Sequence, residues 1–294
     1  GAVIHQLGSS ETFRRSTGVR DKKFDFVDAW FPGSYKESTV RDHMRFFDYW
    51  LKGIDNGVMN CPPVRIEVRT GNAAYYVLEA SEWPIARTDY RRFYLDTSSS
   101  DWEGDSRRQD FMRIGEKVPA SPANAHYEAH VDVGMPIPAP LGTIGGTPRG
   151  STGISFISEP LAEDLVMAGY MKAGLWVSST SSDMDVFISL RVLDENDQEI
   201  RYEAAVMPMH PVHPHPVGHG VLKVSHRQLD AERTTDFLPV HTHLEADYKP
   251  LTSGEIVSIE VGLFPSTAKI RKGCRLRVDI QPYSPEGLPA RAYD

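Results

Sequence analysis

Histidine is the residue type in this sequence that stands out for chemistry. Five histidines lie within residues 210–226, and two more follow at His241 and His243. The first three have the spacing H-x-x-H-x-H and offer neutral imidazoles, which suit zinc or copper: His210, His213 and His215. Prolines punctuate this loop, and no regular element or nearby carboxylate would fix the ligand angles. We therefore expect no metal and no cofactor, with a metal site in this loop as the alternative.

A second group of polar side chains could polarise a substrate carbonyl. His226 and Arg227 are adjacent, and His241 and His243 follow. Their N–H groups can donate to the oxygen of an enone or a quinone methide without a covalent intermediate. We take His226 and Arg227 as candidate catalytic residues, and His241 and His243 as candidate substrate-binding residues. The alternative is that these side chains only hydrogen-bond a long loop, as buried polar groups usually do.

Aromatic and basic side chains are candidates for the wall of the same small-molecule pocket. They are Trp30, Phe31, Tyr35, Tyr170, Trp176, His219, Tyr248 and Lys249. Aromatic residues on strands more often fill a core than touch a ligand, because each one buries a large area. The three N-terminal aromatics could also cover an exposed sheet edge.

One amphipathic helix is predicted near the N-terminus. Thr39 and Asp42 have the spacing of a capping box, and Gly53 supplies a stop. Apolar residues between them recur at helical intervals and form a single stripe: Val40, Met44, Phe47 and Leu51. Such a stripe predicts a helix with one buried face.

The rest of the chain favours short strands separated by turns, with no β–α–β alternation. Strands are predicted around residues 64–68, 166–178, 188–192, 256–264 and 276–280. Residues 119–153 and 210–220 read as excursions rich in proline and glycine. We expect an all-β, jelly-roll β-sandwich of the galactose-binding-like kind with a short helical N-terminal extension. Residues 1–60 would form the extension and residues 61–294 the sandwich.

Four segments together carry a family likeness. They are RFFDYWLKGIDNG at 45–57, PPVRIEV at 62–68, EWPIARTDYRRFYLD at 82–96 and SHRQLDAERTTDFLPVHTH at 225–243. They resemble the C-terminal part of the Xaa-Pro dipeptidyl-peptidase and cocaine-esterase (CocE/NonD) hydrolases. The resemblance implies an α/β-hydrolase domain with a Ser-Asp-His triad, followed by a jelly-roll domain that helps to roof the active site.

The departures from this family concern the triad. A hydrolase nucleophile needs a G-x-S-x-G elbow, and the sequence contains none. Aligned with the family, the histidine position falls at Asp28, whose carboxylate cannot replace an imidazole as general base. We expect no triad hydrolysis by this chain alone. The chain is then either a fragment of a larger hydrolase or a stand-alone descendant, and we favour the descendant.

Charge narrows the choice of partners. The formal net charge of −8 argues against nucleic acid and anionic membranes, and no apolar run is long enough to span a bilayer. A cytoplasmic location is favoured, although a removed signal peptide would leave no trace. A homodimer is a candidate assembly, because loss of a hydrolase domain would leave an apolar face to cover.

Three functions follow as hypotheses. The first is a cofactor-free enzyme that steers a cyclisation, a hetero-Diels–Alder cycloaddition or an isomerisation in secondary metabolism by shape and hydrogen-bond donors. In size and domain content the chain resembles fungal hetero-Diels–Alderases, without a shared motif. The second is the C-terminal accessory domain of a serine hydrolase of the family above. The third is a module that binds carbohydrate or another ligand.

Overall fold

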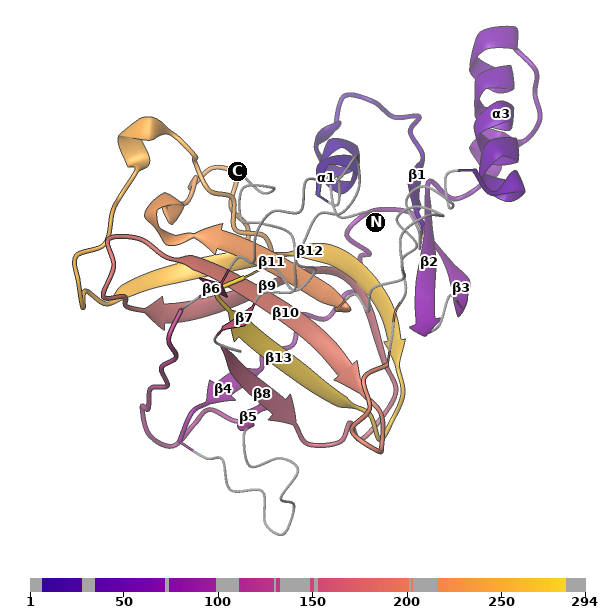
Figure 1. Ribbon diagram of the computed structural model, residues 1–294. Coiled ribbons are helices and arrows are strands. Elements are labelled where there is room, and N and C mark those ends of the chain that lie inside the picture. The colour runs from indigo at the N-terminus through magenta and orange to yellow at the C-terminus, as the bar shows by residue number, and fades with distance from the viewer. Residues whose placement is uncertain are drawn as a thin grey trace.

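Strands dominate the architecture. The computed structural model describes residues 7–27, 35–71, 74–98, 111–129, 131–132, 149–150, 153–200, 202 and 216–283 (Figure 1). Within these ranges the α-helices are α1 (Gly8–Arg15) and α3 (Glu37–Lys52). The prediction of an all-β fold with a short helical N-terminal part is confirmed at this level.

The larger layer is a six-stranded sheet in the order β11-β10-β13-β8-β5-β4. Its neighbours pair antiparallel, except that β5 and β8 run parallel. The strands are β4 (Tyr94–Asp96), β5 (Met112–Gly115), β8 (Ile154–Ser158), β10 (Asp185–Leu193), β11 (Gly218–Lys223) and β13 (Arg275–Gln281). Strand β11 is at the edge of the sheet, as the prolines before it require.

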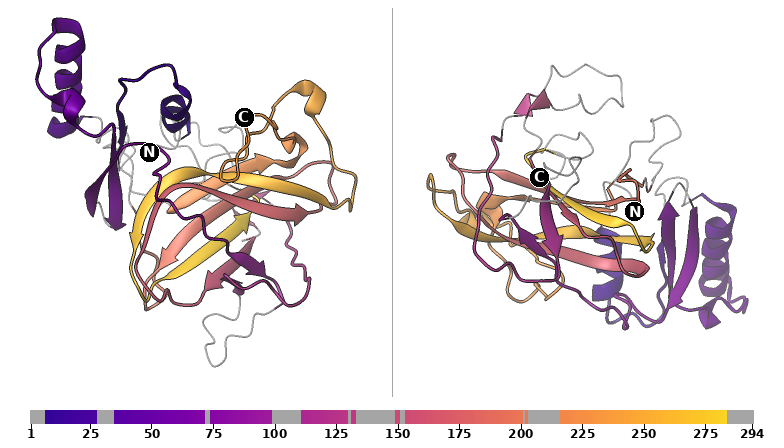
Figure 2. Two further views of the ribbon diagram at one scale, coloured as in Figure 1. Left: turned by 180° about the vertical axis from the view of Figure 1, so that it is seen from behind. Right: turned by 90° about the horizontal axis from the view of Figure 1, so that it is seen from below.

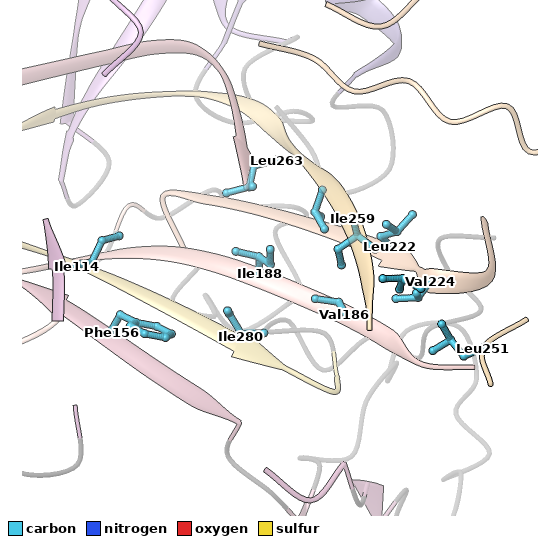
Figure 3. Packing of buried hydrophobic residues seen from close by; sticks show 12 residues of the cluster. Ile114, Phe156, Val186, Ile188, Leu222, Val224, Leu251, Ile259, Leu263 and Ile280 are labelled. Carbon is cyan, nitrogen blue, oxygen red and sulfur yellow. The ribbon is translucent and has the colours of Figure 1, made fainter. Parts of the chain in front are cut away.

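The second layer is the long antiparallel pair β9 (Leu165–Val177) and β12 (Val257–Ile270). Apolar side chains of the two layers meet in the main core. Figure 3 shows Ile188, Leu222 and Ile280 of the larger sheet facing Ile259 and Leu263 of β12. Alternating residues on each strand supply these side chains, so the core follows directly from the period-two pattern of the sequence. The fold is a β-sandwich.

A third sheet carries the N-terminal part of the chain. Strand β2 (Val64–Gly71) pairs parallel with β1 (Phe24–Phe26) and antiparallel with β3 (Ala74–Ala80). Helix α3 connects the two parallel strands and makes a β–α–β unit, which the sequence analysis missed. Because β1 pairs with β2, the sheet crosses the expected boundary at residues 60 and 61, and that boundary stays a prediction.

The smaller elements complete the description. They are the strands β6 (Val131–Asp132) and β7 (Arg149–Gly150), and the 3-10 helices η1 (Val58–Asn60), η3 (Val224–His226) and η4 (Glu245–Asp247).

Helix α3 begins three residues before the expected position. Lys36 is its N-cap, and its side chain makes no capping hydrogen bond. The Lys36 Nζ instead lies 2.9 Å from Oε2 of Glu67, a fully buried carboxylate on β2. The predicted capping residue Thr39 is buried inside the first turn. The ion pair therefore places the start of the helix. Its end is as expected, because Gly53 takes the left-handed conformation with φ of 68°.

A second core joins the N-terminal sheet to the sandwich. Phe24 and Phe26 pack around Trp83, which in turn contacts Tyr170 of β9. The Trp83 Nε1–H donates to the Tyr170 hydroxyl at 3.0 Å, and that hydroxyl donates to Glu11 of α1 at 2.6 Å. Burial and the Glu11 hydrogen bond raise the pKa of Tyr170 to about 12. The hydroxyl therefore stays protonated and anchors α1.

Arg69 ties the same sheet to the sandwich from the other end of β2. Its guanidinium donates to the carbonyl of Thr267 at 2.9 Å and to that of Val217 at 3.1 Å. The planar fork of arginine suits such divergent carbonyls, which the single ammonium of lysine would not satisfy. The N-terminal sheet and the sandwich thus share both apolar and polar contacts.

Candidate functional site

The loop between β11 and β12 holds most of the predicted site residues. It runs through η3 and η4 and projects from the end of the sandwich opposite to α3 (Figure 2). Two backbone contacts fix its ends: the Ser225 N–H donates to Asp183 at 3.0 Å, and the Leu251 N–H donates to the Ser182 carbonyl at 2.7 Å. The loop is therefore held to the turn that follows β9.

Three imidazoles and one phenol gather on this loop. The ring centroids of His226 and His243 are 5.7 Å apart, and those of His226 and Tyr248 are 5.6 Å apart. His241 lies 6.0 Å from His243. His243 has a φ of 50°, in the left-handed region that few non-glycine residues adopt. We call His226, His241, His243 and Tyr248 the histidine cluster.

Two imidazoles of the cluster, those of His241 and His243, are shifted towards the neutral form. Burial and the neighbouring His243 together lower the pKa of His241 from 6.5 to about 4, against a hydrogen bond to the Glu260 backbone. Burial and His226 also lower the pKa of His243. Neutral imidazoles can each donate one hydrogen bond and accept one. Within the described residues the buried Nε2 of His241 has no partner. Through His241 the cluster can therefore offer hydrogen bonds from a neutral imidazole.

Arg227 and Lys249 are used within the loop itself. One Nη of Arg227 donates to the Val224 carbonyl at 3.1 Å and also to the carbonyl of Lys249. The Lys249 ammonium in turn donates to the side chain of Gln228. These contacts close the loop on itself, which is what the loop-stabilising interpretation expects. The catalytic roles of His226 and Arg227 stay predictions.

The remaining predicted residues are spread over the molecule. Tyr35 is exposed and lies two residues before the start of α3. His219 is buried on β11 with its ring 5.1 Å from Phe264, and Tyr170 belongs to the second core. Trp176 is 76% exposed on β9. Trp30, Phe31, Asp28 and the motif His210, His213 and His215 lie outside the described residues. The structure thus brings together only the part of the set that comes from the loop.

One hollow was not anticipated from the sequence. It has a volume of about 530 Å³ and lies between the end of α3 and η1. Its lining residues are Tyr49, Trp50, Gly53, Asp55, Gly57, Met59 and Asn60. The signal that pointed to this place was the family-like segment 45–57, which supplies the first five of them.

Two negative findings hold for the described part of the chain. No three histidine, cysteine, aspartate or glutamate side chains there gather in a way that could hold a metal ion. None of the helices in the same ranges has the length and apolarity to cross a membrane.

The fold defines this chain as a β-sandwich domain with an attached β–α–β unit. A protein-family model described as the X-Pro dipeptidyl-peptidase C-terminal non-catalytic domain matches residues 56–288. The chain belongs to this family, and the family likeness inferred from the four sequence segments is confirmed.

Similar proteins are considerably longer than this chain. "Putative serine esterase Mb1866c" of Mycobacterium bovis and "Putative serine esterase MT1883" of Mycobacterium tuberculosis are each 23% identical over 243 residues. The match covers 81% of this chain and 35% of each relative. A crystal structure of a CocE/NonD family hydrolase from Staphylococcus aureus has a TM-score of 0.76 at 24% identity, covering 94% of this chain and 43% of that one. An alpha-amino acid ester hydrolase has a TM-score of 0.50 at 19% identity, covering 84% and 37%. These structural likenesses show a shared fold.

The comparisons overturn the first functional hypothesis. The matched proteins are a hydrolase-family structure and serine esterases by name, so the prediction of a cyclisation, cycloaddition or isomerisation enzyme in secondary metabolism is wrong. That prediction treated the missing serine elbow as lost chemistry. In a family described as a non-catalytic domain, that absence says nothing about a new reaction. The matches support the alternative of an accessory C-terminal domain.

Proposed function

We propose that this chain acts as the accessory β-sandwich of a CocE/NonD-type serine hydrolase. A separate domain with the α/β-hydrolase fold supplies the nucleophile. The observation that carries the proposal is the family match over residues 56–288. The chain spans about a third of the length of the curated relatives. Those relatives are serine esterases by name, so their catalytic residues can lie in the part of their sequences outside the match. The catalytic residues would thus come from elsewhere, and this chain would shape the site.

The finer fold assignment belongs to the same proposal. A jelly roll of the galactose-binding-like kind is supported by the two facing antiparallel layers and by the edge position of β11. In this arrangement the loop that carries the histidine cluster is the one best placed to reach a neighbouring domain, because it projects from the end of the sandwich. Its neutral donors would contact either a small-molecule substrate or the catalytic domain. The carbohydrate-binding alternative stays a prediction, for which Trp176 is the residue to inspect.

A fluorophosphonate probe tests the proposal in two steps. Applied to this chain alone, the probe should label no residue, because the sequence has no serine elbow. Applied to native extracts, it should label a serine on a polypeptide that copurifies with this chain or contains it. A labelled serine within this chain would contradict the first expectation. Purification of the chain free of any probe-reactive serine hydrolase would contradict the accessory role.

A further inference from the structure

Residues 241–250 are a weakly anchored part of the loop between β11 and β12. Most of their side chains are exposed, and the residues on either side are buried, with Leu238 in the second core and Leu251 in the main core. Figure 1 shows this loop, in orange, projecting from the sandwich. We call residues 241–250 the flap. A segment with little buried apolar surface between two fixed ends can open locally while the rest of the chain stays folded.

Backbone hydrogen bonds hold the flap near both of its ends. The Thr242 N–H donates to the Gln228 carbonyl at 3.0 Å, and the Lys249 N–H donates to the Ser225 carbonyl at 2.9 Å. Between them, His243 keeps its φ of 50°, a conformation that costs free energy in a residue with a side chain. Opening of the flap relieves that strain.

Imidazole rings also fasten the flap to the elements beside it. The His226 ring of η3 lies 5.7 Å from that of His243 and 5.6 Å from that of Tyr248, and these two residues belong to the flap. On β12, the Glu260 backbone is hydrogen-bonded to the ring of His241. The attachment of the flap to η3 and β12 therefore depends on groups that can take up protons.

A second proton on the His241 ring is poorly accommodated while the flap is closed. A charged imidazole carries two N–H donors. The Glu260 backbone can accept one of them, but the buried Nε2 has no partner within the described residues. The ring of His243, which can itself be charged, lies 6.0 Å away. Protonation thus leaves a buried donor unpaired and a charge close to a second imidazole.

Charged groups around His241 do not compensate for this proton. The Glu260 carboxylate attracts it, but that carboxylate is paired with Lys172 at 2.8 Å, and burial outweighs its effect. Four further charged side chains belong to the flap or directly follow η3: Arg227, Glu245, Asp247 and Lys249. The two cations donate hydrogen bonds within the loop. The two acids form no ion pair with the histidine cluster in the part of the chain that the structure describes.

We propose that the histidine cluster is an acid-sensitive switch, in which protonation of His241 releases the flap from β12 and η3 while the sandwich stays folded. The proton binds more tightly to the open form, because the ring is then in water. Burial lowers the pKa of His241 from 6.5 to about 4 in the closed form, so the closed form is fully favoured above pH 6.5 and loses this advantage as the pH falls towards 4. The inference concerns this chain by itself and goes beyond the proposed function.

Amide hydrogen exchange of the wild-type chain tests the switch, followed by NMR at about pH 7 and about pH 4.5 and at several low urea concentrations. Protection factors are compared, because they correct for the intrinsic effect of pH on exchange. The amides of Thr242 and Lys249 should lose about 30-fold in protection at the lower pH, allowing for the partial exposure of His241. Their protection should depend little on urea, since a local opening exposes little surface. The Ile188 amide in β10 should instead show the steep urea dependence of global unfolding.

His241→Gln separates this proton from other effects of acid. Glutamine keeps a side-chain N–H donor but does not titrate, so most of the pH-dependent loss of protection should disappear. The control His126→Gln removes an exposed histidine outside the loop and should respond like the wild type.

Three results would overturn the switch. In the wild type, equal protection of the Thr242 and Lys249 amides at both pH values would do so, whether or not the variant folds. A urea dependence of these two amides as steep as that of Ile188 would show that the flap opens only with the whole protein. A full pH response in His241→Gln would assign the proton to another group.

Discussion

His241 combines a buried position with a titratable side chain. Its imidazole is neutral in the folded protein because burial and two neighbouring histidines disfavour the charged form. The same ring contacts the Glu260 backbone, so the loop that carries the histidine cluster is connected to β12 through a group whose state depends on pH. The pH response of the protein should therefore report on this residue.

Acid should destabilise the fold through His241. Its pKa falls from 6.5 to about 4 on folding, so the unfolded chain binds a proton that the folded chain does not in this window. The contribution is complete above pH 6.5 and is lost as the pH falls towards 4. Allowing for partial exposure, the loss is about 2 kcal/mol.

Urea unfolding of the wild type and of His241→Gln at about pH 7.5 and about pH 4.5 measures this loss. The variant should show a smaller decrease than the wild type, and the exposed-histidine control His126→Gln should behave like the wild type. Equal pH dependence in the wild type and His241→Gln would contradict the assignment.

Tyr170 is the second residue whose hydrogen bonds lead to a prediction about stability. Tyr170→Phe removes a hydroxyl that accepts from Trp83 and donates to Glu11, and it leaves the buried indole N–H without its partner. We expect a loss of about 1 to 3 kcal/mol in unfolding free energy. Denaturant titration checks the value, with the more exposed Tyr76→Phe as a control that should change little. A neutral Tyr170→Phe would mean that water replaces the hydroxyl.

At the scale of elements, the two layers of the sandwich approach closely where two glycines meet. A Cβ added at Gly220 of β11 would lie 2.3 Å from the carbonyl oxygen of Gly262 on β12. No side chain can be inserted there without moving backbone. The two glycines thus set the spacing between β11 and β12.

Gly220→Ala should therefore destabilise the sandwich by about 1 to 3 kcal/mol or prevent folding. Gly174→Ala is the matched control on β9, because a Cβ there meets no atom within 4 Å. Alanine at Gly174 should be neutral or slightly stabilising, since glycine weakens a strand. Thermal melting of both variants provides the measurement. Equal effects of the two substitutions would show that the close approach does not limit the packing.

The residue patterns within single elements explain how much of the fold could be predicted from the sequence. The alternation in β2, β10 and β13 identified these strands, because period-two burial is a local property. Helix α3 was also found from a local pattern. Its apolar stripe was expected to be buried but is exposed, because only the tertiary arrangement decides what covers a helix. Its start was also misplaced, because the Lys36–Glu67 ion pair joins residues 31 positions apart. Strand β1 has three residues and pairs with β2 across α3, so no local pattern could reveal it.

The candidate site shows the same difference between local patterns, which the sequence reveals, and tertiary contacts, which it does not. His226, His241, His243 and Tyr248 lie near one another because they are close in sequence and share one loop, and their role as a site stays a prediction. Tyr35 and Tyr170 were assigned to the same pocket wall, but residue type alone does not say which face of an element is buried. The hollow at the end of α3 needed the return of the chain through η1, which no spacing rule predicts.

At the scale of the whole molecule, the N-terminal sheet and the sandwich should unfold as one unit. Trp83, Tyr170 and Arg69 connect the two across long sequence separations, and the second core contains residues of β1, β2 and β9. We expect a single calorimetric transition whose calorimetric and van't Hoff enthalpies agree. Two separated transitions would show that the N-terminal sheet and the sandwich unfold independently.

The contact between Gly220 and Gly262 also limits where a ligand could enter the sandwich. The backbone of β11 contacts the backbone of β12 at that point, so no ligand can enter the interior of the sandwich there. An added side chain at Gly220 would have to displace backbone, so substitutions that test ligand binding are better placed in the loops at the end of the sandwich.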